Sequence, residues 1–451
     1  MINYSKIECG QLKLVGCSHS LEEILIRYII IRMRYIYSIF IAIYSSLIFL
    51  VSPFNKKAKQ IIKGRKETFS KLRNGISKSD KVAWFHAASL GEFEQGRPLI
   101  ESFKQKYPEF KILVSFFSPS GYEVRKNYNN ADVVVYLPSD SIKNAKRFIK
   151  LAHPDFVFFI KYEFWYNLIR RAKKKGAKIY QVSLILRPNQ YFFSRWGGWY
   201  RGELKNFDYF FVQNLQTKDL LNSIGINNCQ ITGDTRFDRV SEIALKAKEF
   251  PKVEEFCQND KVILMGSSWE KDEALMKEAL KDTKTHFKLI IAPHQIHNSH
   301  IEQIKTLFPD SIKYSEIENI DYQNKENADK VLIIDSIGIL SSLYRYASIA
   351  YIGGGFGVGI HNILEAATFG KPILFGPNHE KFKEATDLIE KEGAFSFKES
   401  NELSKLVDKL LSNEDYYKKS SDICRGYIEE NIGACERILS KIEQLNNKDG
   451  D

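Results

Sequence analysis

Two successive series of short apolar runs limit the possible folds of this 451-residue chain more than any other feature. Amphipathic stretches separate the runs, and apolar strands that alternate with helices are typical of a parallel sheet covered on both faces. The predicted fold class is therefore α/β, with two Rossmann-like domains that face a cleft. The first series comprises 81–85, 111–117, 132–137, 156–160, 177–183 and 209–213, and the second comprises 262–265, 287–292, 331–334, 349–352 and 372–375.

A charged stretch between the two series is predicted to be helical, because it carries no strand signal. The first residues of the chain have no clear pattern, which leaves open whether translation starts at Met1 or Met33. The expected segments are an N-terminal extension at 1–32, an apolar anchor at 33–53, domains at 54–237 and 261–430, a linker at 238–260, and a C-terminal helix with a polar tail at 431–451.

The segment 35–52 holds no charged residue and approaches the roughly 20 residues that span a bilayer. A cleaved signal peptide would need a small-x-small site after it, which the sequence LVSPFNKK does not supply. A buried core helix is the other alternative, but basic residues flank the segment on both sides. Because the denser positive charge follows it, the rest of the chain is expected in the cytoplasm. The interpretation is an uncleaved membrane anchor, which either spans the bilayer or lies in its interface.

The charge balance is basic, with 66 Lys and Arg against 55 Asp and Glu and a net charge of +11. Such an excess favours anionic partners, although a solvated lysine-rich surface gives the same count. The six cysteines form no Cys-x-x-Cys pair and are interpreted as free thiols. His294, His297 and His300 recur every third residue, which spreads them around a helix, so no metal site is predicted.

Three charged motifs follow predicted strands or precede the linker. In HAASLGE (86–92), Glu92 is placed at a helix start, as a general base or only as a first-turn carboxylate. In KYEFWYN (161–167), Glu163 follows a strand among aromatic residues and is either a site residue or an ordinary loop carboxylate. In GDTRFD (233–238), Arg236 either faces the cleft and stabilises negative charge or pairs with Asp238.

A glycine-rich segment, YIGGGFGVGIHNILE (351–365), followed by GKPILFGPN (370–378), predicts a strand, a loop and a helix start. Backbone N–H groups in such a loop can bind a phosphate. The four-residue spacing of His361 and Glu365 predicts that they share a helical face. No G-x-G-x-x-G or G-x-x-x-x-G-K-[ST] register fits the loop, which excludes dinucleotide and P-loop sites.

Taken together, these motifs resemble the 3-deoxy-D-manno-octulosonic acid (Kdo) transferases, which add Kdo to the lipid A precursor of lipopolysaccharide, from the anchor to about Phe397. The resemblance implies a GT-B type fold, with Glu92 as catalytic base and Glu163 as a second acidic site residue. Lys161 stands where many members have another acid, and Arg236 replaces a lysine that assists the transition state.

The resemblance also implies the residues that bind the donor, CMP-Kdo. His294 stands where many members have arginine, Ile339 replaces a common glutamate, and the glycine-rich loop is a residue shorter than usual. The implied donor residues are Pro293, His294, Ile337, Gly338, Ile339, Asn362, Ile363, Leu364 and Glu365, with further contacts expected from Arg187, Ser267, Gly354, Gly355 and His361.

The implied reaction is inverting transfer of Kdo to a glucosamine 6-hydroxyl of the lipid A precursor lipid IVA, without metal or cofactor. The expected partners are CMP-Kdo, the lipid acceptor and the anionic inner-membrane surface, with the catalytic domains on the cytoplasmic side and no nucleic acid. The alternatives are a UDP-sugar transferase or epimerase of the same fold and a membrane-tethered scaffold without catalysis. The number of Kdo residues added, the lipid A variant and the oligomeric state are left open.

Overall fold

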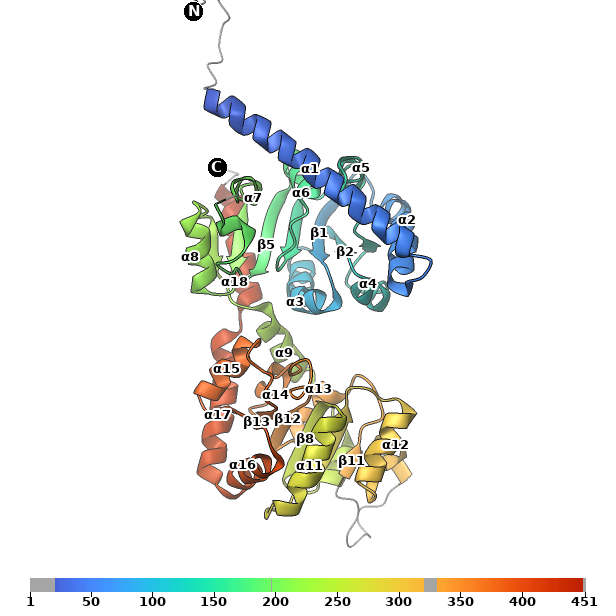
Figure 1. The fold of residues 1–451 in the computed structure, drawn as a ribbon, viewed down its shortest axis with the longest axis vertical. Helices are drawn as coiled ribbons and strands as arrows, with labels where there is room; N and C mark the ends of the chain where they lie inside the picture. Colours follow the sequence, from blue (N-terminus) through green and yellow to red (C-terminus); the bar gives the residue numbers. More distant parts are fainter. Residues whose placement is uncertain (1–20, 196, 320–330, 449–451) are drawn as a thin grey trace, which may run out of the picture.

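The structure is a computed structural model that describes residues 21–195, 197–319 and 331–448. Most of the predicted extension at 1–32 lies outside these residues, as do Cys9, Cys17 and the last residues of the polar tail, Asp449 to Asp451. The described chain forms two stacked bodies, each built on one sheet (Figure 1).

The first sheet has seven parallel strands in the order β3-β2-β1-β4-β5-β6-β7. Its two faces carry separate apolar cores, because alternate strand residues such as Trp84 and Phe85 point to opposite sides. The strands are β1 (Lys81–Ala87), β2 (Phe110–Phe116), β3 (Val133–Tyr136), β4 (Phe156–Ile160), β5 (Lys178–Leu184), β6 (Tyr209–Val212) and β7 (Cys229–Ile231). The helices between them are α3 (Leu90–Lys106), α4 (Pro119–Arg125), α5 (Ile142–Ala152), α6 (Tyr166–Lys174), α7 (Gly198–Leu204) and α8 (Leu215–Ser223).

The second sheet also has seven parallel strands, but in a different order, β10-β11-β9-β8-β12-β13-β14, in which β11 lies between β10 and β9. Its strands are β8 (Val262–Ser268), β9 (Lys288–Pro293), β10 (Ser311–Lys313), β11 (Val331–Ile333), β12 (Ile349–Ile352), β13 (Ile373–Phe375) and β14 (Ala394–Ser396). Its helices are α11 (Glu270–Asp282), α12 (Asn298–Leu307), α13 (Leu340–Leu343), α14 (Leu364–Ala367), α15 (Lys383–Glu390), α16 (Ser400–Ser412) and α17 (Glu414–Asn431). The predicted fold class is confirmed. Strands β7, β10 and β14 were not predicted.

Two helices connect the domains. α9 (Thr235–Leu245) follows the first sheet and packs against helices of both domains, and α10 (Pro251–Cys257) leads into the second sheet. At the end of the chain, α18 (Ala434–Lys448) returns to the first domain (Figure 1). Its apolar face completes a core of the first sheet, with Cys435, Ile438, Leu439 and Ile442 buried there.

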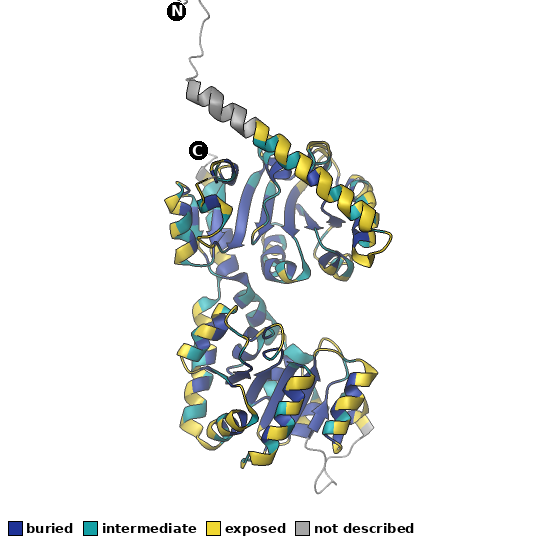
Figure 2. Cartoon of the chain, in the orientation of Figure 1, coloured by how far each residue is buried: buried dark blue, intermediate teal, exposed yellow. Residues whose placement is uncertain are grey.

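Two helices precede the first strand. α1 (Leu21–Val51) crosses the first domain and projects beyond it, and α2 (Lys56–Gly75) packs against β3 and α5. Much of the outer surface of α1 is exposed (Figure 2). Within the described residues, 32–51 is the one segment long and apolar enough to cross a membrane.

Candidate active site

The three charged motifs meet at the carboxyl ends of the first sheet. Glu92 follows β1 and Glu163 follows β4, and these two strands are hydrogen-bonded neighbours. Between them lies Lys161, a left-handed residue with φ of 64° directly after β4. Burial lowers the pKa of Lys161, Arg236 lowers it further, and Asp234, Glu92 and Glu384 oppose the shift. Lys161, itself part of the second motif, therefore interacts electrostatically with groups from the other two motifs and from the second domain.

Glu92 occupies the first turn of α3, as predicted. Its Oε2 accepts hydrogen bonds from the Ser89 backbone N–H at 2.9 Å and from the Ser89 hydroxyl at 3.1 Å. Among the residues that the structure describes, none is hydrogen-bonded to Oε1. Burial, and then the nearby charge of Glu163, raise the pKa of Glu92 above its ordinary value. Glu92 therefore combines a helix-capping oxygen with a second oxygen that is available to a substrate.

Glu163 is held by two ring nitrogens. Trp165 Nε1 donates to Glu163 Oε2 at 2.7 Å, and His86 Nε2 lies 3.2 Å from the same oxygen. The opposite nitrogen of the buried His86 ring, Nδ1, is 2.9 Å from Ser115 Oγ on β2. This arrangement fixes the orientation of Glu163 from the sheet. His86 belongs to the same motif as Glu92, but the sequence prediction gave it no role.

Arg236 bridges the two domains. Its Nε donates to Asp234 at 2.8 Å, and its Nη1 donates to Glu384 of α15 at 2.9 Å. The two carboxylates outweigh desolvation and raise the pKa of Arg236. The alternative partner Asp238 is wrong, because Asp238 accepts hydrogen bonds from the backbone N–H groups of Gly433 and Cys435 before and in α18. No local sequence signal indicated Glu384.

Asp234, Arg236 and Glu384 line a cavity of about 620 Å³ between the domains, whereas Glu92 and Glu163 are not among its lining residues. Arg187 and Lys161 also line it, and the expected contact of Arg187 with a substrate stays a prediction. Several further cations come from the second domain, so the cavity suits an anionic ligand. The charged lining residues are Lys161, Arg187, Asp234, Arg236, Lys381, Lys383, Glu384, Asp387 and Lys391.

In the second domain, the rings of Trp269, His294 and His361 form a stack. The ring centroids of His294 and His361 are 4.4 Å apart, and those of Trp269 and His294 are 4.7 Å apart. Trp269 Nε1 also donates to His361 Nε2 at 3.2 Å. Burial, and then His294, lower the pKa of His361, so this ring is neutral near pH 7. The stack joins two predicted donor residues and adds Trp269, which was not predicted.

Another part of the predicted donor set gathers at the start of α14. Asn362 Nδ2 donates to Glu365 Oε1 at 3.0 Å, and Asn362 Oδ1 accepts from the Leu364 N–H at 3.2 Å. Burial raises the pKa of Glu365, while Asn362 and the nearby Arg239 counteract the rise. Arg239 also lines a hollow of about 440 Å³ with Gly338 and Ile339.

The glycine-rich loop differs from two predictions. Its N–H groups at Gly354, Gly357 and Gly359 are not available to a phosphate, because Gly354 donates to the buried Asp272 and the other two donate to Gly354 O. His361 and Glu365 do not share a helical face, because α14 begins only at Leu364.

Close packing explains the loop glycines instead. A Cβ on Gly353 would lie 2.2 Å from the carbonyl oxygen of Ser267, and a Cβ on Gly355 would lie 2.6 Å from Gly376 N. The loop is therefore fixed against β8 and the segment that follows β13. Pro293 ends β9, and the next residue, His294, donates its N–H to Ser268 O at 2.9 Å.

The predicted fan of three histidines around one helix is also wrong. α12 begins at Asn298, so only His300 lies on it. His300 is buried and its ring nitrogens lie 2.9 Å from Gln295 O and from Glu273 Oε2. Within the described part of the chain, no group of His, Cys, Asp and Glu side chains is arranged to hold a metal ion.

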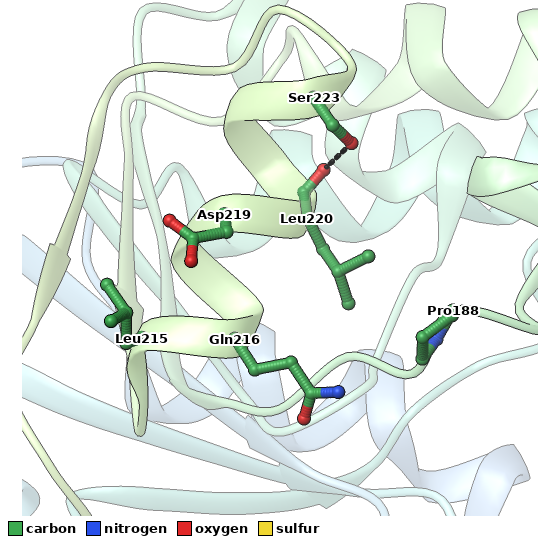
Figure 3. A pocket seen from close by; sticks show the side chains of 6 residues that line it. All are labelled: Pro188, Leu215, Gln216, Asp219, Leu220 and Ser223. Atoms are coloured by element: carbon green, nitrogen blue, oxygen red, sulfur yellow. Dashed lines mark hydrogen bonds between the residues drawn. The ribbon is translucent and has the colours of Figure 1, made fainter.

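A separate surface hollow of about 460 Å³ adjoins the cavity at Gln216. Figure 3 shows its lining from α8 and from Pro188, with Ser223 Oγ donating back to the Leu220 carbonyl at 2.7 Å. Asp219 is its only charged lining residue, so this hollow lacks the convergent charges of the cavity.

The two facing Rossmann-like domains and the charged cavity between them define the GT-B class of glycosyltransferase folds. One solved structure that shares the fold is a UDP-GlcNAc 2-epimerase from Neisseria meningitidis bound to UDP-GlcNAc, with a TM-score of 0.57 and 17% identity over 81% of this chain and 100% of that chain.

The family described as 3-deoxy-D-manno-octulosonic-acid transferase (kdotransferase) matches residues 63–239. A 3-deoxy-D-manno-octulosonic acid transferase from Aquifex aeolicus is 30% identical over 77% of this chain and 92% of its own length. One from Rickettsia bellii is 28% identical over 81% of this chain and 87% of its own length. The chain belongs to the Kdo transferase family, and is thus a glycosyltransferase of lipopolysaccharide biosynthesis.

Proposed function

We propose that the chain transfers Kdo from CMP-Kdo to a glucosamine 6-hydroxyl of the lipid A precursor lipid IVA, with inversion and with Glu92 as general base. The observation that carries the proposal is the position of Lys161, which lines the cavity and is close enough to Glu92, Asp234, Arg236 and Glu384 to interact with each of them electrostatically. A base, two cationic groups and a carboxylate of the second domain therefore lie near the edge of the cavity where donor and acceptor are proposed to meet.

The chemistry follows from this arrangement. Glu92 Oε1 takes the proton of the acceptor hydroxyl while that oxygen attacks the anomeric carbon of Kdo. The bond from this carbon to the CMP phosphate oxygen breaks on the opposite face, and the electron pair leaves with CMP. A single displacement inverts the anomeric centre. The raised pKa of Glu92 makes its carboxylate a stronger base than an ordinary glutamate.

Glu163 and Arg236 assist at the same edge. Glu163 is oriented by His86 and Trp165 and keeps the pKa of Glu92 high through its charge. Arg236 faces the cavity and stabilises negative charge on the donor. CMP carries a single phosphate and is a stable leaving group, so the proposed step uses no metal.

The donor is proposed to bind the second domain. The stack of Trp269, His294 and His361 offers a flat aromatic surface for a base, and the Asn362–Glu365 pair offers acceptors for ribose hydroxyls. The other proposed donor residues are Pro293, Ile337, Gly338, Ile339, Ile363 and Leu364, with Arg187, Ser267, Gly354 and Gly355 as outer contacts.

The proposed site of action is the cytoplasmic face of the inner membrane, where α1 anchors the chain. Exposed apolar side chains of α1 and exposed lysines at the start of α2, among them Lys56 and Lys57, support an anionic lipid surface as partner.

The test is Kdo transfer from CMP-Kdo to a tetraacylated lipid A precursor, with chelator present. Wild type and Glu109→Gln, a matched change at an exposed carboxylate just after the same helix, are expected to transfer Kdo. Glu92→Gln is expected to lose about 10²- to 10⁴-fold in kcat. Transfer by Glu92→Gln at the wild-type rate would reject the base. Activity with a UDP-sugar and none with CMP-Kdo would reject the donor.

A further inference from the structure

α1 is attached to the first domain along one side. Tyr37 donates its hydroxyl to Asp140 Oδ2 at 2.7 Å, and Ser45 Oγ lies 2.6 Å from Ser139 Oγ. Arg34 Nε donates to Asn167 Oδ1 at 3.4 Å, and Ile41 is buried between these contacts. The contacts extend to Ile48, so about 21 Å of helix rests on the domain at 1.5 Å per residue.

The attached residues recur every three or four positions and therefore form one helical face. The opposite face is apolar and exposed, with Phe40 at 66% and Phe54, just beyond the helix, at 92%. The residues of this outer face are Ile36, Ile39, Phe40, Ile43, Leu47, Leu50, Val51 and, beyond α1, Phe54.

Asp140 makes the attachment specific. Its buried carboxylate accepts hydrogen bonds from Tyr37 and from the backbone N–H groups of Asn167 and Leu168, which start α6. The same carboxylate therefore fixes α1 and the helix that follows the Glu163 loop. Aromatic rings form a second connection between α1 and the Glu163 loop. Tyr44 stacks on Phe117 with a centroid distance of 6.2 Å, and the ring centroids of Phe117 and Trp165 are 5.0 Å apart.

The domain residues that hold α1 follow the carboxyl ends of the strands. Phe117 follows β2, Ser139 and Asp140 follow β3, and Asn167 follows β4. These are the ends from which Glu92 and Glu163 also project.

A helix that spans a bilayer is surrounded by hydrocarbon. The first domain, however, packs against α1 along most of the apolar segment of this helix. Crossing the bilayer in this state would bring Asp140, Asn167 and the charged surface around them into the hydrocarbon core, at a large cost in desolvation. An interfacial helix has no such conflict, because its polar side faces the aqueous domain and only its outer face enters the lipid.

We infer that α1 lies in the plane of an anionic membrane surface, with its outer face in the lipid, and does not cross the bilayer. This inference rests on the membrane residence proposed above. The exposed Lys56, Lys57 and Lys59 at the start of α2, shortly after α1 ends, meet the lipid headgroups. In this orientation the membrane borders the strand ends that carry Glu92, so a lipid acceptor reaches the base without leaving the bilayer.

The first test is topology. The full chain is expressed from Met1 in bacteria with a single thiol reporter, either the native Cys17 before α1 (with Cys9→Ser) or Lys57→Cys after it (with Cys9→Ser and Cys17→Ser). The other four cysteines are buried. A membrane-impermeant maleimide is expected to label both reporters in inverted inner-membrane vesicles and neither in spheroplasts. Labelling of the two ends from opposite sides of the membrane would overturn the inference.

The second test is depth. Phe40→Cys, in the middle of the apolar segment, carries a bimane label in the full chain on vesicles of phosphatidylglycerol and phosphatidylethanolamine. A spin label near the headgroup is expected to quench the fluorescence more than one near the acyl-chain end. Stronger quenching by the deep label would overturn the inference, as would no quenching by either because α1 pairs with a second copy. Neither readout depends on Kdo transfer, so a failed transfer assay and a failed orientation are distinguishable.

Discussion

Arg236 Nη1 and Glu384 Oε1 are 2.9 Å apart, and this ion pair joins the first domain to α15 of the second beside the cavity. The guanidinium is also bonded to Asp234, which Gln95 of α3 holds at 2.7 Å. The group that is proposed to stabilise donor charge is thus the group that connects the domains, so binding and domain position are coupled through it.

This coupling is measurable as a double-mutant cycle. Arg236→Met and Glu384→Gln are each expected to lower kcat/KM, and the double variant is expected to be little worse than Arg236→Met, with a coupling of about 0.5–3 kcal/mol. The control cycle is the exposed pair Lys419 and Glu392, with an expected coupling of about 0.2–1 kcal/mol in thermal unfolding and none in kcat/KM. If the effects of the Arg236 and Glu384 changes on kcat/KM were additive, the ion pair between these residues would not contribute to kcat/KM.

The pH dependence of transfer reports the state of Glu92. Because burial and the charge of Glu163 raise the pKa of Glu92, and the base acts only when deprotonated, activity is expected to fall on acidification at a higher pH than for an ordinary glutamate. Glu163→Gln removes the like charge, so the acidic limb of the residual kcat profile is expected to move to lower pH. If the acidic limb of the Glu163→Gln profile lay at the same pH as that of the wild type, a group other than Glu92 would determine the pH at which activity falls.

The aromatic stack predicts an effect on donor binding. His294→Ala is expected to raise the Kd for CMP about 10-fold, because it removes the ring that stacks on both Trp269 and His361. His297→Ala, at an exposed histidine three residues away, is the matched control and is expected to leave the Kd unchanged. Calorimetric titration with CMP measures both, and equal affinities for the two variants would contradict the assignment.

Two glycines of the second domain should respond oppositely to alanine. Gly353→Ala places a Cβ 2.2 Å from the Ser267 carbonyl oxygen, a backbone atom that cannot move aside, and is expected to lower the melting temperature. Gly426→Ala in α17 meets nothing within 4 Å and is expected to stabilise the domain by about 1 kcal/mol. Scanning calorimetry of both variants tests the packing of the loop, and a neutral Gly353→Ala would refute it.

Among the contacts that attach α1, the Tyr37 hydroxyl is the one bonded to the buried Asp140. Tyr37→Phe keeps the ring contacts with Tyr166 and Trp199 but removes a donor from the buried Asp140, at an expected cost of about 1–3 kcal/mol. Tyr35→Phe, at an exposed ring on the other face, is expected to cost nothing measurable. Thermal unfolding in detergent measures the difference, and equal melting temperatures would show that Tyr37 does not secure the helix.

The long apolar runs predicted every central strand of both sheets, because strands buried on both faces need continuous apolar sequence. The three strands that were missed, β7, β10 and β14, have three residues each and lie at sheet edges. An edge strand of this length, such as Cys229–Ile231, is half exposed and carries too few apolar residues to stand out from a loop.

As with the strands, the sequence predicted some residues near the candidate site and missed others. The places of Glu92 and Glu163 near the carboxyl ends of β1 and β4 were predicted correctly because each follows a recognisable strand, while their roles stay predictions. Glu384 and Trp269 were missed because their partners come from distant segments, Arg236 from the other domain and His361 from a later loop. The prediction that His361 and Glu365 share a helical face was wrong because it assumed a helix that already includes His361. α14 begins three residues later, at Leu364.

The return of α18 to the first sheet has a consequence for biosynthesis. Cys435, Ile438, Leu439 and Ile442 fill a core whose other residues are made hundreds of positions earlier. While the ribosome is still translating the second domain, this core of the first domain stays open, and α18, which is made after the second domain, closes it. The first domain therefore completes one of its cores only after the second domain has been synthesised.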